Sequence, residues 1–149
     1  MMEAHEEELG PIDVVVIGFP PGAPMTGEAV PIFLDLVDRG IIRVFDALFV
    51  RKDADGTFSG FDLGDLDEDN LGHFTAFAGA TTGLLTEDDV ALAAAEIEPG
   101  SAAVMIVYEN RWAAPFAAAI RRNGGELIAS ERIPVQQLID ALDAAEAAA

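Results

Sequence analysis

The chain has 149 residues, of which 51% are hydrophobic and 23% are charged, a size and composition typical of one globular domain. Eight basic residues against 27 acidic ones give a net charge of −19. This charge argues against binding to nucleic acid or to an anionic membrane surface, since both recruit basic side chains. The chain has no cysteine, which excludes disulfides, thiolate nucleophiles and cysteine-bound metals.

The segments that would direct the chain to a membrane lack the required pattern. Residues 1–10 form an acidic tail, whereas a signal peptide begins with basic residues and continues into an apolar run. The longest stretch of low charge, residues 71–86, is shorter than the ~20 apolar residues of a membrane-spanning helix. We therefore expect a cytoplasmic protein that forms a single domain over residues 1–149.

The first third of the chain predicts a strand, a helix and a second strand. The β-branched run 12–19 lies between prolines and is typical of a buried strand. Apolar residues recur at helical spacing in residues 28–39, and Gly40 ends this helix. Residues 41–52 predict a strand that is apolar on both faces.

A strongly acidic segment, residues 53–98, comes next, with twelve carboxylates and no basic residue. It begins with a predicted hairpin turn and a short returning strand over residues 57–63. It ends with a helix that begins at Thr86 and has acidic residues in its first turn, where they suit the helix dipole. We interpret the segment as an insertion between two halves of the domain.

The last third predicts a strand over residues 101–108, a helix over 111–122 that ends at a Gly-Gly pair, and a last strand over 126–133. Pro134 is expected to begin a final helix. The apolar face of this helix is formed by four side chains at helical spacing: Val135, Leu138, Ile139 and Leu142.

The two ends of the chain resemble copies of one βαβ unit, because an apolar strand, a helix with a proline and then a glycine recur in the same order. Two such units predict an α+β fold, a ferredoxin-like double βαβ with the acidic insertion between the halves and a C-terminal helix. Its antiparallel sheet would carry helices on one face. The alternative is a doubly wound parallel sheet, because strands and helices alternate along much of the chain.

The second face of the predicted sheet requires a cover, since its strands are apolar on both faces. An uncovered apolar face of several hundred Å² would be a liability for a soluble protein. The insertion, the last helix or another subunit are the three candidates for this cover.

Candidate catalytic groups are few. His5 and His73 are the only histidines, and neither has the neighbours of a metal site or of a serine-hydrolase motif. Asp46 and Glu131 fall at similar points of the two repeated strands, where a carboxylate pair would be conceivable. No spacing indicates an enzyme, and no cofactor is expected.

The acidic segment is the most distinctive electrostatic feature of the chain. Such a block suits weak binding of divalent cations or contact with a basic protein partner, and its plainer interpretation is a solvated loop with helix-capping acids. The candidate cation ligands are Asp62, Asp65, Asp67 and Asp69.

Four aromatic residues are candidates for a subunit contact, because interfaces are enriched in aromatic side chains, with core packing as the alternative. They are Phe74, Phe77, Tyr108 and Trp112.

Several stretches of the sequence resemble a group of uncharacterised bacterial proteins that carry a domain of unknown function and are often labelled predicted membrane proteins. These stretches are DVVVIGF, DRG followed by IIRVFDALFVRKDADG, EPGSAAVMIVYEN and RRNGGELI. The resemblance implies the ferredoxin-like core and supplies no reaction. The membrane label does not carry over, because the apolar stretch of the longer relatives is replaced here by residues 72–85, which are short and polar.

The sequence therefore favours a non-enzymatic, self-associating protein with a scaffolding or regulatory role, in which subunits cover one another's sheet face. The alternative is a module that binds a small molecule or a divalent cation through the acidic insertion.

Overall fold

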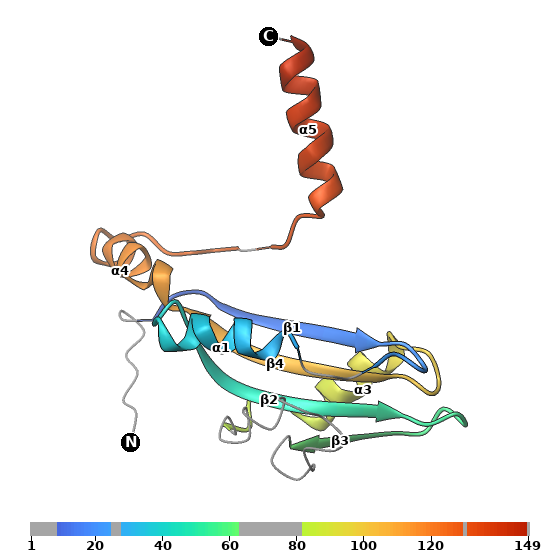
Figure 1. Ribbon diagram of the computed structural model, residues 1–149. Coiled ribbons are helices and arrows are strands. Elements are labelled where there is room, and N and C mark those ends of the chain that lie inside the picture. Colours follow the sequence, from blue (N-terminus) through green and yellow to red (C-terminus); the bar gives the residue numbers. More distant parts are fainter. Residues whose placement is uncertain (1–8, 25–27, 63–81, 130, 149) are drawn as a thin grey trace.

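The centre of the molecule is a four-stranded antiparallel sheet in the order β1-β4-β2-β3 (Figure 1). The computed structural model describes residues 9–24, 28–62, 82–129 and 131–148. The strands are β1 (Ile12–Phe19), β2 (Ile42–Lys52), β3 (Phe58–Asp62) and β4 (Ala102–Asn110). Each lies where the sequence predicts a strand.

The order of the strands results from two βαβ connections, each of which skips a strand that belongs to the other connection. β1 and β2 run parallel to each other, because each pairs antiparallel with β4, which lies between them. In the same way, β3 and β4 lie on either side of β2. The two connections contain the helices α1 (Val30–Asp38) and α3 (Glu87–Ala95). The fold is therefore mixed, with helices and an antiparallel sheet, but a ferredoxin-like topology is not confirmed, because this strand order is unusual.

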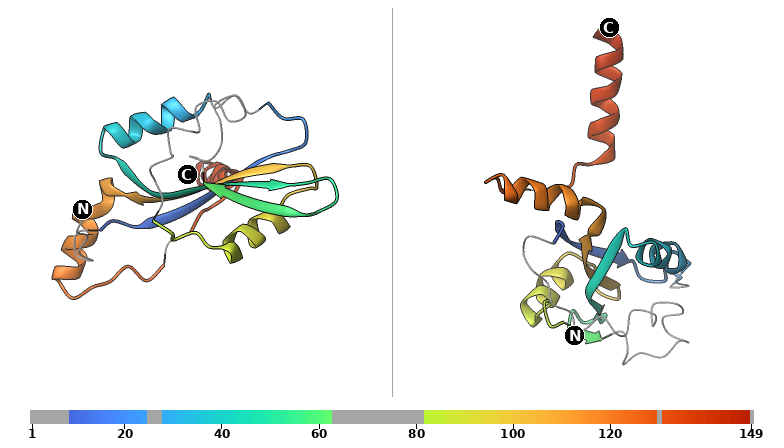
Figure 2. Two further views of the ribbon diagram at one scale, coloured as in Figure 1. Left: turned by 90° about the horizontal axis from the view of Figure 1, so that it is seen from below. Right: turned by 90° about the vertical axis from the view of Figure 1, so that its left-hand side faces the viewer.

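The helices α1 and α3 cover opposite faces of the sheet, as the left view of Figure 2 shows. Under α1, Val104 and Ile106 of β4 pack with Phe49 of β2. The intervening residues Ala103 and Met105 point to the other face, where they pack against α3. The insertion, one of the three covers expected from the sequence, therefore supplies the helix that covers the second face. Because β4 is apolar on both faces, each face of the sheet requires its own cover.

Part of the acidic segment 53–98 belongs to this layered core. β3 pairs along the end of β2, and α3 packs on the sheet beneath it. The close approach depends on Gly60 of β3, where an added Cβ would lie 2.8 Å from Cγ2 of Val90 in α3. The second βαβ unit of the fold is thus β3-α3-β4, and the sequence had placed that unit further along the chain.

Beyond β4, the chain forms a short 3₁₀ turn, η4 (Arg111–Ala113), and the expected helix, α4 (Ala114–Arg122). The last strand expected over 126–133 does not form in the described part of that segment, residues 126–129 and 131–133. Its apolar residues favour a strand, but a strand requires a neighbouring ladder to satisfy its backbone groups. Ile128 in this segment is 87% exposed, so the segment lies outside the core.

The final helix, α5 (Val135–Ala148), begins directly after Pro134, whose carbonyl accepts hydrogen bonds from the N–H groups of Gln137 and Leu138. Figure 1 and the right view of Figure 2 show α5 projecting away from the sheet and its helices. No residue of α5 is buried. Within the described ranges, no helix combines the length and the apolar character that crossing a membrane requires.

Candidate functional site

The most unusual group in the core is the carboxylate of Glu109, which is fully buried near the end of β4. Its Oε2 accepts a hydrogen bond of 2.8 Å from the backbone N–H of Gly10. Its Oε1 lies 3.0 Å from Nη2 of Arg43 and 3.6 Å from Nη1 of Arg111. These residues form an ionic cluster in which two cations face one buried anion.

The ionic cluster fastens the start of the described chain to the sheet. Gly10 fits only because it has no side chain, since a Cβ there would overlap the carbonyl oxygen of Asn110. Next to it, the carbonyl of Pro11 accepts a 2.8 Å hydrogen bond from the N–H of Asn110. Nη1 of Arg121 in α4 donates to the carbonyl of Leu9 at 2.8 Å. The geometry of the cluster is that of a structural clamp, because Oε2 of Glu109 holds the amide of Gly10 while Oε1 is ion-paired with the two arginines.

A second buried carboxylate, Asp46, sits at an irregularity of the β2–β4 register between Val44 and Asp46. Its Oδ1 accepts the N–H of Ala47 at 3.0 Å, and its Oδ2 accepts the N–H of Leu85 at 2.8 Å. Asp46 therefore holds the segment that leads into α3. The strand expected to carry Glu131 does not form in the described residues of that segment, so the structure gives no support to a pair between these two carboxylates.

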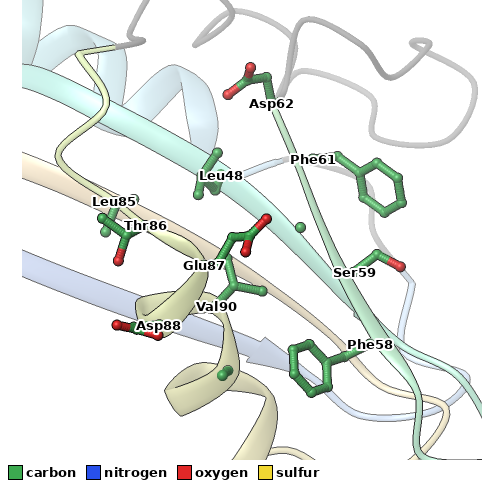
Figure 3. A pocket seen from close by; sticks show the side chains of 12 residues that line it. Leu48, Phe58, Ser59, Phe61, Asp62, Leu85, Thr86, Glu87, Asp88 and Val90 are labelled. Carbon is green, nitrogen blue, oxygen red and sulfur yellow. The ribbon is translucent and has the colours of Figure 1, made fainter.

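A groove lies between β3 and the first turn of α3, with a volume of about 610 Å³ (Figure 3). Leu48, Gly60 and Val90 contribute apolar lining, and Phe58 is turned toward α3. Carboxylates line it as well: Asp62 at the end of β3, and Glu87 and Asp88 in α3. The other three predicted cation ligands, Asp65, Asp67 and Asp69, lie outside the described residues.

The acidic residues at the start of α3 have a local structural role. Asp89 accepts hydrogen bonds from the backbone N–H and the hydroxyl of Thr86, at 2.9 and 3.1 Å, which confirms Thr86 as the start of the helix. Glu87 and Asp88 stand in the same first turn, where negative charge suits the positive end of the helix dipole. In the described ranges, no group of three or more His, Asp or Glu side chains is arranged to hold a metal ion.

The predicted subunit-contact aromatics occupy different environments. Tyr108 lies under α1, edge-on to the ring of Phe33 with centroids 6.0 Å apart. Trp112 in η4 is 68% exposed, and its Nε1 donates to Oδ1 of Asn110 at 3.3 Å. Phe74 and Phe77 lie outside the described residues.

Two apolar surfaces of the described chain are exposed, and the sequence had not indicated that they would be. On β1, the side chains of Ile12, Val14 and Val16 are between 46% and 54% exposed, although the run was interpreted as a buried strand. On α5, the four residues of the predicted apolar face are between 42% and 71% exposed. For β1, the sequence carried only an indirect signal of this exposure. It indicated that both sheet faces need a cover, but not which strand would be left uncovered.

The family comparison covers nearly the whole chain. Residues 8–148 match the model of DUF6325, a family of unknown function. The chain belongs to this family. No curated protein matches the chain. No solved structure matches it. Membership in DUF6325 therefore brings no reaction or ligand, and the chemistry has to be argued from the described surfaces themselves.

Proposed function

We propose that the protein is a non-enzymatic, self-associating α+β protein with a scaffolding or regulatory role. The observation that carries this proposal is the apolar surface of β1 and α5, which no described element of the chain covers. Water-exposed rows of Val, Ile and Leu on both a sheet and a helix are typical of surfaces that bind another protein.

The structure of α5 supports association in particular. A helix of 14 residues is marginal in isolation, and most helices obtain their stability by packing an apolar face. The apolar face of α5 has no partner within the described chain, so a second copy would supply both a surface for this helix and the stability that it lacks. Burying four half-exposed aliphatic side chains contributes roughly 1 kcal/mol each.

The charge of the chain sets the conditions for association. A net charge of −19 on each copy repels a second copy at long range. Salt screens such repulsion over a Debye length of ~10 Å at 0.1 M. Association driven by apolar surface should therefore strengthen as the salt concentration rises, the opposite of what an interface held by ion pairs would show.

The arrangement of the buried acids supports a role without catalysis. Asp46 holds two backbone amides, and Glu109 is held by two arginines and the amide of Gly10. The oxygens of both carboxylates are therefore already paired within the protein, which does not favour a role as a general acid or base.

Light scattering across micromolar concentrations tests the proposal on the full chain. We expect a mass that is a multiple of 15.7 kDa and that falls on dilution. Replacing Leu138 and Leu142 together by Glu removes half of the apolar face and should weaken association. Gln137→Glu, on the polar face of the same helix, adds charge without changing the apolar face and is the matched control. A wild-type mass of 15.7 kDa at all concentrations would contradict the proposal.

A second candidate function is binding of a small molecule or a divalent cation, favoured by the groove between β3 and α3. Its volume of about 610 Å³ falls within the roughly 300–1,000 Å³ of ligand pockets. Ca²⁺ or Mg²⁺ bound to the native state would raise the melting temperature by mass action. An unchanged melting temperature at millimolar Ca²⁺ and Mg²⁺ would remove the cation from consideration, and Asp62→Asn is the variant that should abolish a shift.

A further inference from the structure

We infer that two copies of the chain pair through the outer edge of β1, so that their sheets join into one continuous antiparallel sheet. The inference rests on the proposed self-association and identifies the surface and the partner. The partner is a second copy, and the contact is a backbone ladder between the two β1 strands.

β1 is an edge strand with the features of a pairing surface. In the described part of the chain, it has β4 on one side and no strand on the other. Its register against β4 runs without a bulge from Ile12 to Phe19. Natural edge strands are usually protected by lysines, prolines, bulges or short length. β1 has none of these within its eight residues, whereas the opposite edge, β3, has only five residues.

The hydrogen bonds of the sheet show which backbone groups of β1 point outward. The N–H of Asn110 donates to the carbonyl of Pro11, so Pro11 and the odd-numbered residues of β1 point toward β4. On the far side of β4, the bond from the N–H of Lys52 to the carbonyl of Ser101 gives the same alternation. The N–H and C=O groups of residues 12, 14, 16 and 18 therefore point away from the sheet.

These outward groups are self-complementary about a two-fold axis through Val15, perpendicular to the sheet. This axis places Ile12 opposite Gly18 of the second copy and Val14 opposite Val16. Every outward N–H then meets an outward C=O. A shift of the axis by one residue in either direction leaves an outward residue at one end of each strand without a partner.

The side chains agree with this register. The exposed row Ile12, Val14 and Val16 of one copy continues into the same row of the other, on the same face of the joined sheet. Asp13, the one charged residue of β1, lies opposite Ile17 rather than opposite a second Asp13. Its carboxylate already accepts a 2.8 Å hydrogen bond from Nδ2 of Asn110. No like charges oppose each other across the new ladder.

The chemistry of the edge favours a second copy over a different protein. A basic partner would be recognised by carboxylates, and the outward positions of β1 are Ile, Val, Val and Gly. This edge is uncharged, and two copies of it can satisfy each other's backbone N–H and C=O groups in an antiparallel register. No different protein is required as the partner. Homodimers with two-fold symmetry are the commonest soluble assemblies.

Hydrogen exchange of the backbone amides tests the inference on the unaltered chain. Below and above the concentration at which mass increases, the amides of Val14, Val16 and Gly18 should change from fast to slow exchange. The amides of Val15 and Ile17 are the internal control, because they already face β4 in a single copy. Equal exchange of the Val14 and Val16 amides at both concentrations would overturn the inference.

Val16→Pro provides the matching variant. The N–H of Val16 makes no bond to β4, so proline there removes a donor that only the second copy uses. We expect the variant to unfold cooperatively like the wild type but to have a dimer dissociation constant more than about tenfold higher. Val16→Thr retains both the N–H and the β-branched shape and should associate like the wild type.

The outcomes separate this inference from the proposed function. A wild-type chain that is monomeric at all concentrations would overturn both. A wild type that associates, with Val16→Pro associating equally well, would leave the self-association proposal standing and overturn the β1 edge as its surface. If Val16→Pro fails to fold, the exchange of the wild-type amides decides the question.

Discussion

Glu109→Gln tests the clearest energetic consequence of the fold, the burial of one carboxylate between two arginines. Glutamine retains the shape of the side chain and an oxygen that can accept the N–H of Gly10, so the substitution removes mainly the charge. Breaking a buried ion pair by removing one partner costs about 3–5 kcal/mol, because the other charge is left buried and uncompensated. Here the side chains of Arg43 and Arg111 are 25% and 43% exposed, so each regains part of its hydration when the carboxylate is lost.

We therefore expect a loss at the lower end of that range, about 3 kcal/mol of the free energy of unfolding. In urea denaturation followed by circular dichroism, this loss would lower the midpoint by roughly 1.5 M. Asp35→Asn is the control, because Asp35 of α1 forms an exposed ion pair with Arg39, the residue after that helix, and such a pair is worth about 0.5 kcal/mol or less. Glu109→Leu combined with Arg43→Leu should recover part of the loss, since no buried charge is then left alone. If Glu109→Gln changes stability no more than Asp35→Asn does, the interpretation of the cluster as a clamp is wrong.

Two further predictions concern the β2–β3 hairpin and its contact with α3. Gly60→Ala should destabilise the fold by about 1–3 kcal/mol, because the added methyl group meets Cγ2 of Val90, and Val90→Ala should restore much of the loss in thermal unfolding. If Val90→Ala does not restore stability, the contact between residue 60 and Val90 is not the cause of the destabilisation. Thr57→Val should raise the pKa of Asp55, which the side-chain and backbone hydrogen bonds of Thr57 hold below its ordinary value of 3.8. A lowered pKa contributes stability above the unfolded pKa that is lost as the pH falls through the folded one, so wild type and variant should differ at neutral pH and converge in strong acid. An NMR titration of Asp55 that gives the same pKa in both chains would contradict this.

Local patterns were sufficient to predict most of the elements but not their arrangement. The run 12–19, the helix that begins after Thr86 and the final helix after Pro134 all formed where the sequence placed them, because capping residues and apolar periodicity act within a few residues. The strand over 126–133 was predicted from the same kind of pattern, but a strand must also pair with a neighbouring strand, and the described residues of this segment pair with neither outer edge of the sheet. That condition depends on residues far away in the sequence.

The buried sites show the same division. Glu109 is a charged residue at the end of an apolar strand, which is a visible signal, but Arg43 and Gly10 come to it from distant parts of the chain. Likewise, the sequence indicated that both sheet faces are apolar and that the insertion was one of three covers for the second face, without deciding among the three. The predicted cation ligands beyond Asp62 lie outside the described residues, so they remain predictions.

The position of β4 in the sheet has a consequence for how the chain acquires its structure. β4 is the last of the four strands of this sheet to be synthesised, yet it lies between β1 and β2, which pair with β4 and not with each other. Among the described strand pairs, only the β2–β3 hairpin joins neighbouring segments of the sequence, whereas β1 pairs with residues about ninety positions further along the chain. Folding should therefore be slow and occur in one late step. A chain that ends before residue 102 should show no cooperative unfolding transition, because β1 and β2 are joined in the sheet only through β4.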